Sequence, residues 1–164
     1  MLTKNFTCCF TGHRQLLPEH AQALPAAVEA GIRGLIAQGY FIFAAGGAMG
    51  FDTLAAETVL ALKAEFSQLR LVIVAPCADQ ANNWAAADRL RYERLRQAAD
   101  DYICLEAAYT PGCMRRRNRC LVEMSGACLA YCLRPRTGSA QTVAYAGAQG
   151  LEIVDVVGLL GCAV

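Results

Sequence analysis

The 164-residue chain has the length of one ordinary domain, and a composition of 55% hydrophobic and 18% charged residues suffices for a single buried core. Its 15 basic residues nearly balance its 14 acidic ones, which argues against a protein that holds nucleic acid or an acidic membrane through its overall charge. We therefore expect one domain over residues 1–164, in which any site for a polyanion is local.

The nine cysteines would indicate disulfide bonds in a small secreted protein, but the N-terminus lacks the long apolar run of a signal peptide. This favours a reducing, cytoplasmic setting, with most cysteines buried as small apolar side chains. Cys113, Cys120, Cys128 and Cys132 have neither a CxxC pair nor a nearby histidine, so no metal site is expected. The apolar stretch Val156–Val164 is far shorter than the ~20 residues of a membrane span, so no membrane segment is expected either.

Short apolar runs alternate along the chain with stretches of helical periodicity. Strands are predicted at Phe6–Thr11, Phe41–Ala45, Arg70–Ala75, Asp101–Leu105, Cys128–Leu133 and Glu152–Val154, and helices near Pro25–Gln38, Phe51–Glu65, Gln80–Ala99, Met114–Ser125 and Ser139–Gln149. The run at Leu71–Ala75 is apolar at every position, which indicates a strand buried on both faces. The pattern predicts a three-layer, doubly wound Rossmann-like α/β domain with a mainly parallel sheet.

The loop after the first strand contains Thr11, Gly12, His13 and Arg14. Ligands of doubly wound domains bind beyond the carboxyl ends of the strands, where the strand order switches. We expect Gly12 to leave room for a ligand there and the other three residues to supply polar contacts. His13 is either a proton carrier or a hydrogen-bonded loop residue, and the second role is the more common one.

A glycine-rich loop follows the second strand and leads into a helix, with Gly46, Gly47, Ala48, Gly50 and Asp52 as its candidate binding residues. Glycines let the backbone approach a ligand, and free N–H groups at a helix start attract anions, so this loop is predicted to hold a ribose or a phosphate. The alternative is a tight strand-to-helix turn. Asp52 either accepts from a ligand hydroxyl or only stabilises the first turn of the helix.

Two further segments are expected at the same edge of the sheet. Gly138, Ser139 and Thr142 open the last long helix and offer N–H and hydroxyl donors to a phosphate, although Ser139 would equally serve as a helix cap. Arg117 and Asn118 begin the preceding helix, within a cluster of arginines that would otherwise be a solvated helix face.

These loops together resemble the SLOG superfamily of Rossmann-like nucleotide-related binders, and within it the YpsA-like branch. The resemblance lies in "FTGHR" at Phe10–Arg14, "GGAMGFDTLAAE" at Gly46–Glu57, "CMRRRN" at Cys113–Asn118 and "TGSAQTVAYA" at Thr137–Ala146. It implies a bound nucleotide or nucleotide derivative, such as an ADP-ribose-like ligand, and a sensor or regulatory role; no other cofactor is implied.

The resemblance also implies alternatives. Related LOG-type proteins hydrolyse nucleoside 5′-monophosphates, but this chain has Gln141 and Thr142 where their late-loop motif has a glutamate, which argues against that reaction. YpsA-like proteins are linked to cell division and stress responses, which suggests a regulatory scaffold with a protein partner. The related DprA acts in DNA processing, yet the balanced charge predicts no autonomous nucleic-acid binding here. The sequence is compatible with both a monomer and a homo-oligomer.

Overall fold

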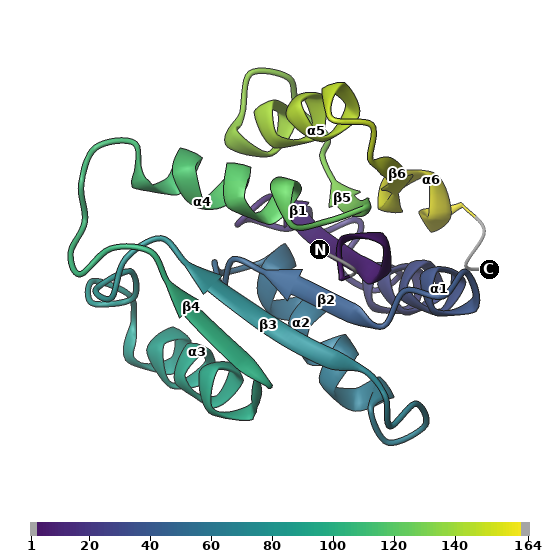
Figure 1. The fold of residues 1–164 in the computed structure, drawn as a ribbon, viewed down its shortest axis with the longest axis horizontal. Coiled ribbons are helices and arrows are strands. Elements are labelled where there is room, and N and C mark those ends of the chain that lie inside the picture. Colours follow the sequence, from purple (N-terminus) through teal and green to yellow (C-terminus); the bar gives the residue numbers. More distant parts are fainter. Residues whose placement is uncertain (1–2, 162–164) are drawn as a thin grey trace.

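Six parallel strands form one sheet with the order β4-β3-β2-β1-β5-β6 (Figure 1). The computed structural model describes residues 3–161. The strands are β1 (Thr7–Gly12), β2 (Ile42–Ala45), β3 (Arg70–Ala75), β4 (Asp101–Cys104), β5 (Ala127–Tyr131) and β6 (Glu152–Asp155). The predicted fold class, a doubly wound Rossmann-like α/β domain, is confirmed, and the sheet is entirely parallel.

Helices cover both faces of the sheet and so complete the three layers (Figure 1). They are α1 (Leu24–Ala37), α2 (Phe51–Leu62), α3 (Ala86–Ala98), α4 (Cys113–Glu123), α5 (Gly138–Ala148) and the short α6 (Val156–Leu160), after a 3₁₀ turn, η1, at Lys4–Phe6. One apolar cluster joins one face of the sheet to α1, α2, α3 and α6, and a second cluster joins the other face to α4 and α5.

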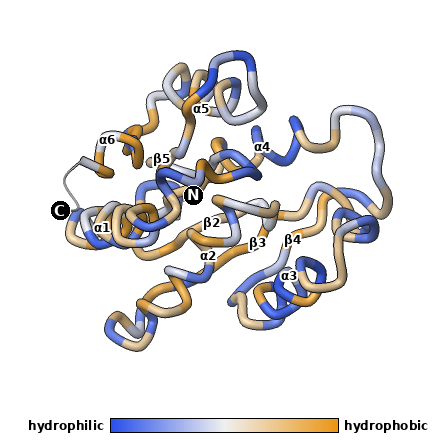
Figure 2. Tube along the Cα trace, turned by 180° about the vertical axis from the view of Figure 1, so that it is seen from behind, coloured by the Kyte–Doolittle hydropathy of each residue, from blue (hydrophilic) through white to orange (hydrophobic). Residues whose placement is uncertain are grey.

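The inner strands are buried because their side chains on both faces pack against helices. β2 and β5 are buried at every position, and β3 at every position after Arg70. The hydropathy of the chain follows this arrangement, with hydrophobic residues along β2 and β3 and hydrophilic residues along much of α4 and in the loop that leads into α5 (Figure 2). Two-sided burial requires the continuous apolar runs that predicted these strands.

Two helices differ from the predictions. The helix expected at Gln80–Ala99 begins only at Ala86, because residues 79–83 form turns and Ala85 is extended. Asp79, Asn82 and Asn83 favour such turns, since their side chains compete with helical hydrogen bonds. The short α6 was not predicted; the Asp155 side chain caps it by accepting from the Val157 N–H.

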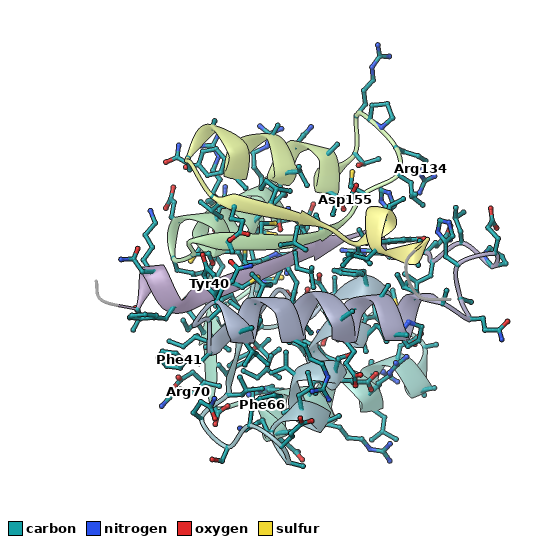
Figure 3. All side chains as sticks on the ribbon, turned by 90° about the vertical axis from the view of Figure 1, so that its right-hand side faces the viewer. Tyr40, Phe41, Phe66, Arg70, Arg134 and Asp155 are labelled. Atoms are coloured by element: carbon teal, nitrogen blue, oxygen red, sulfur yellow. The ribbon has the colours of Figure 1, made fainter. Side chains whose placement is uncertain are left out.

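The strand order places the loops after β1 and β5 next to each other. The chain runs outward from β1 through β2 and β3 to β4, then crosses back to the other side of β1 to form β5 and β6. β1 pairs with β5 as far as Gly12 and Tyr131, the last residue of each strand. The switch in strand order lies here, at the carboxyl edge. Figure 3 shows Arg134 at this end of the sheet, opposite Tyr40 and Arg70 near the amino ends of β2 and β3.

The eight cysteines at positions 3–161 are all free thiols, and five of them are buried: Cys8, Cys9, Cys77, Cys113 and Cys128. Most cysteines therefore pack as the sequence predicted. Cys104 is exposed, and Cys162 lies outside the described residues. No helix within residues 3–161 is long and apolar enough to cross a membrane.

Candidate functional site

A pocket of about 470 Å³ lies at the carboxyl edge of the sheet, where the switch in strand order predicts a ligand. Four chain segments meet there: the loop after β1, the start of α2, the first turns of α4, and the loop that leads into α5. Of the residues predicted for the site, those that line this pocket are Thr11, Gly12, His13, Arg14, Ala48, Asp52, Arg117, Asn118, Gly138 and Ser139. The structure therefore brings together loops that are distant in the sequence.

His13 joins the two central loops of the site. Its Nε2 accepts a hydrogen bond of 2.8 Å from the Leu133 N–H, just after β5, and its carbonyl accepts from the Phe51 N–H at 3.1 Å. Burial and the charge of nearby Arg134 lower the pKa of His13, which favours the neutral ring that this acceptor role requires. In the structure His13 is a hydrogen-bonded loop residue; its role as a proton carrier stays a hypothesis.

The glycines of the early loops make room for protein atoms. Gly46, Gly47 and Gly50 do not line the pocket, contrary to expectation. A Cβ at Gly46 would overlap the Arg117 guanidinium, and one at Gly50, where φ is +80°, would overlap the Arg14 backbone. A Cβ at Gly12 would meet the Phe51 ring. The room that Gly12 leaves is therefore occupied by Phe51 and not by a ligand, although Gly12 itself borders the pocket.

Asp52 places a buried carboxylate in the pocket wall. It lies in the first turn of α2 with 6% of its surface exposed, and its Oδ2 accepts from the Ala48 N–H at 3.4 Å. Burial raises the pKa of the Asp52 carboxyl, while the charge of Arg117 opposes this shift. Within residues 3–161 no basic group forms an ion pair with it. Among the described residues that line the pocket, Asp52 is the one carboxylate.

Arg117 carries a buried positive charge from α4 to the pocket, with 5% of its surface exposed. Its Nη1 donates to the Gly46 carbonyl at 2.6 Å, and its Nε donates to the Asn118 side-chain oxygen at 2.8 Å. Burial lowers the pKa of Arg117 and Asp52 opposes this, but a guanidinium stays protonated in proteins. These bonds fix the side chain where it borders the pocket.

The start of α5 offers backbone donors. Gly138 and Ser139 are its first two residues, and N–H groups there have no acceptor within the helix. The cap is Thr137 and not Ser139: Thr137 Oγ1 accepts from the Ala140 N–H at 3.1 Å. Thr142 does not line this pocket, and its hydroxyl donates to the Gly138 carbonyl at 2.9 Å. A free helix N-terminus beside a buried guanidinium favours an anion.

Several residues of the pocket were not predicted: Phe10, Gln15, Met114, Arg134 and Thr137. Arg134 and Thr137 belong to the loop between β5 and α5. The sequence had predicted binding residues only after this loop, from Gly138 onward. The helical spacing of Met114 and Arg117, which places both on one face, is the signal that would have found Met114.

The family of the chain follows from its sequence. The model of the YspA SLOG family, named YpsA, matches residues 9–150, which include every segment of the site. The chain belongs to this SLOG family. A UPF0398 protein of Halalkalibacterium halodurans is 31% identical over 115 residues, which are 69% of this chain and 61% of that protein. The SPbeta prophage-derived protein YoqJ of Bacillus subtilis is 27% identical over 116 residues, 63% of this chain and 68% of that protein.

Solved structures show the same fold in larger proteins. The DNA processing protein A of Streptococcus pneumoniae superposes with a TM-score of 0.62 and 18% identity, covering 94% of this chain and 51% of that chain. The DNA processing protein A of Helicobacter pylori superposes with a TM-score of 0.64 and 18% identity, covering 94% of this chain and 66% of that chain. Its structure is described as showing a single-stranded DNA binding mode. That description concerns the H. pylori protein; the absence of autonomous nucleic-acid binding here stays a prediction.

The charged groups that line the pocket at the carboxyl edge favour an anion. Within residues 3–161, no three side chains of His, Cys, Asp or Glu lie together as a metal site would need. Arg14 and Arg134 stand exposed at the rim, and Arg117 is buried in the wall. Three guanidinium groups and a helix N-terminus against one carboxylate give the pocket a positive potential.

Proposed function

We propose that the chain binds a phosphorylated nucleotide or nucleotide derivative, a nucleoside phosphate or an ADP-ribose-like molecule, and acts as a sensor or regulatory domain. The pocket between the loops after β1 and β5 is the site. The phosphate group of the ligand would lie at the start of α5 and accept hydrogen bonds from the N–H groups of Gly138 and Ser139. Arg14, Arg117 and Arg134 would balance its charge.

The observation that carries the proposal is the combination of α5 and Arg117 in one pocket. A helix N-terminus alone also attracts side chains and solvent. Here it faces a pocket that also contains a buried guanidinium, which Gly46 and Asn118 hold in place. Asp52, on the α2 side, offers an acceptor for a ribose hydroxyl. A ligand that carries a phosphate and a sugar matches both halves of the pocket.

Thermal unfolding in the presence of nucleotides tests this function. At about 100 times its dissociation constant, a ligand stabilises the protein by about 2.7 kcal/mol. We expect 5′-AMP or ADP-ribose to raise the Tm of the wild type and to lose most of this effect in Arg134→Ala. The control is Arg94→Ala, an exposed arginine on α3 away from the pocket, which should respond as the wild type does. A Tm that no nucleoside phosphate or ADP-ribose raises would refute nucleotide binding.

Asp52 gives specific support to a second candidate, the hydrolysis of a nucleoside 5′-monophosphate to free base and ribose 5-phosphate. The late loop lacks the glutamate of LOG-type enzymes, but Asp52 supplies a carboxyl to the same pocket from α2. Burial raises its pKa, as a general acid requires. Glu57 is excluded from this role, because it lies on the surface and pairs with Arg91.

Chromatography of nucleoside monophosphates incubated with the protein separates the two candidates. Binding without release of free base supports the sensor. Release that disappears in Asp52→Asn, while the ligand still raises the Tm, would establish the hydrolase instead. The variant keeps the size of the side chain and an oxygen able to accept from the Ala48 N–H.

A further inference from the structure

A second pocket, of about 230 Å³, opens between α4 and α5 beside the first one. Asn118 and Gly138 line both pockets, so the two adjoin where α4 approaches the start of α5. The polar side chains of the second pocket include Arg115, Arg119 and Tyr145. The site proposed above does not use these three side chains, and the two arginines among them are positively charged.

The arginines around these two pockets lack the acidic partners that five other arginines of the described residues have. Within residues 3–161, Arg33, Arg70, Arg91, Arg96 and Arg116 form ion pairs with carboxylates. In the same part of the chain, no carboxylate lies within ion-pair distance of the arginines that line the pockets, which are Arg14, Arg115, Arg117, Arg119 and Arg134. Charges that the protein leaves uncompensated favour an external anion.

Helix α4 shows this contrast within a few residues. Arg116 turns toward the preceding loop, where it donates to Glu106 at 2.8 Å and to the Thr110 hydroxyl at 2.6 Å. Arg115 and Arg119, which are four residues apart and therefore lie on one helical face, line the second pocket instead. The four arginines at positions 115–119 are thus divided. Arg116 is neutralised by Glu106, Arg117 borders the first pocket, and the remaining two line the second pocket together.

Arg119 is also held in place. Its guanidinium carbon lies 5.4 Å from the centre of the Tyr145 ring, a cation–π arrangement, and the Tyr145 hydroxyl donates to Glu123 Oε1 at 2.8 Å. Glu123 does not line the pocket and forms no ion pair with Arg119. The contact orders a long side chain without neutralising it, which lowers the entropy cost of binding an anion there.

We infer that the second pocket is a subsite for a further phosphate-bearing unit, so that the ligand extends beyond one nucleoside monophosphate. This inference rests on the proposed function: the first phosphate lies at the start of α5, and the chain of the ligand continues past Asn118 to Arg115 and Arg119. The shared chemistry is a nucleotide elongated through phosphate. Its two sources are a pyrophosphate-linked derivative such as ADP-ribose and a short 5′-phosphorylated oligonucleotide.

Calorimetric titration with 5′-AMP, ADP-ribose and the 5′-phosphorylated diadenylate tests the subsite. We expect at least one elongated ligand to bind the wild type about tenfold more tightly than 5′-AMP, as a charged hydrogen-bonded contact would provide. The double variant R115A/R119A should reduce that advantage to less than about twofold and leave 5′-AMP affinity nearly unchanged. The matched control is R89A/R94A, which removes two exposed arginines of α3 that have no ion pair within residues 3–161.

The outcomes distinguish a failure of the subsite from a failure of nucleotide binding itself. The elongated ligand that shows the advantage identifies the source. Equal affinities for all three ligands, or an advantage that persists in R115A/R119A, would overturn the subsite and leave the proposed function intact. Binding of none of them would remove the proposed function and the subsite with it.

Discussion

At the scale of single residues, Gly50 determines how the two early loops fit together. Its φ is +80°, and a Cβ at this position would overlap the backbone of Arg14. The loop after β1 can therefore rest on the start of α2 only if residue 50 has no side chain. The Phe51 N–H donates to the His13 carbonyl at the same contact, so the geometry of the pocket depends on it.

We expect Gly50→Ala to lower the free energy of unfolding by roughly 2 kcal/mol or more, because it combines a strained backbone with overlap against another backbone segment. Urea denaturation measures the loss. Gly34→Ala is the matched control: Gly34 is exposed within α1 with no atom close to an added Cβ, so alanine should stabilise by about 0.5–1 kcal/mol. Equal effects at both positions would show that the two loops are not in contact.

Asp52 should give the stability a distinct pH dependence. Its pKa in the folded protein is raised above the ordinary value of 3.8 by burial, so the folded state holds the proton more tightly than the unfolded state. The contribution of Asp52 to the free energy of unfolding is therefore greatest below pH 3.8 and falls as the pH rises through its folded pKa.

Urea unfolding of the wild type and Asp52→Asn from acid to neutral pH measures this contribution. We expect the wild-type value minus the variant value to decrease as the pH rises and then to level off, because asparagine does not titrate. The opposite slope would mean that Arg117 dominates the environment of the carboxyl and lowers its pKa.

At the scale of elements, the start of α5 depends on its cap. Thr137 is extended, and its Oγ1 accepts from the Ala140 N–H and donates to the Arg134 carbonyl. One hydroxyl thus positions both the rim residue Arg134 and the free N–H groups of Gly138 and Ser139. The site at this end of α5 and the stability of the helix share a single determinant.

We expect Thr137→Ala to lower the free energy of unfolding by about 1 kcal/mol and to weaken nucleotide binding as well, because the cap and the rim loosen together. Thr137→Ser retains the hydroxyl and should preserve both properties. Chemical denaturation and calorimetric titration measure them. Unchanged stability in Thr137→Ala would mean that another group caps the helix.

The sequence predicted the elements best where one physical cause acts alone. β3 was predicted with its observed bounds, because a strand buried on both faces leaves a continuous apolar run. The predicted start of α3 at Gln80 was wrong because residues 79–83 form turns before the helix begins at Ala86. Trp84 and Tyr92 are eight residues apart, as two positions on one helical face would be, yet Trp84 precedes the helix. Their rings do pack, with centroids 5.5 Å apart, but across the helix boundary. Helical spacing of two apolar residues therefore indicates that their side chains pack together, but both residues need not belong to the same helix.

At the scale of the whole molecule, strand order decides which predicted residues meet. Local patterns place residues at the ends of strands but do not say which strands are neighbours. Because β1 lies between β2 and β5, His13, Asp52 and Gly138 surround one pocket. The roles of Gly46 and Gly50 could not be predicted from the sequence. The space that a Cβ would fill at these positions is taken by Arg117 and by the Arg14 backbone, which are distant in the sequence. A glycine in a sequence indicates that space is needed but not what fills it.

The distribution of charge leads to a last prediction. The net charge is only +1, yet arginines that lack ion pairs within residues 3–161 gather at the carboxyl edge, while carboxylates neutralise many others elsewhere. Nucleotide binding should therefore respond to salt although the net charge does not suggest it. We expect the affinity for ADP-ribose to fall about tenfold between about 0.05 and 0.5 M NaCl, since exposed guanidinium groups at the rim are screened over this range.

Calorimetric titration at several salt concentrations measures this dependence, and urea unfolding at the same concentrations is its control. The ion pairs of the surface contribute little to stability, so salt should change the free energy of unfolding by less than about 1 kcal/mol. Arg134→Ala should flatten the salt dependence of binding, because it removes one exposed charge from the rim. An affinity that salt leaves unchanged would mean that neutral hydrogen bonds hold the ligand, and that the arginines at this edge serve another partner.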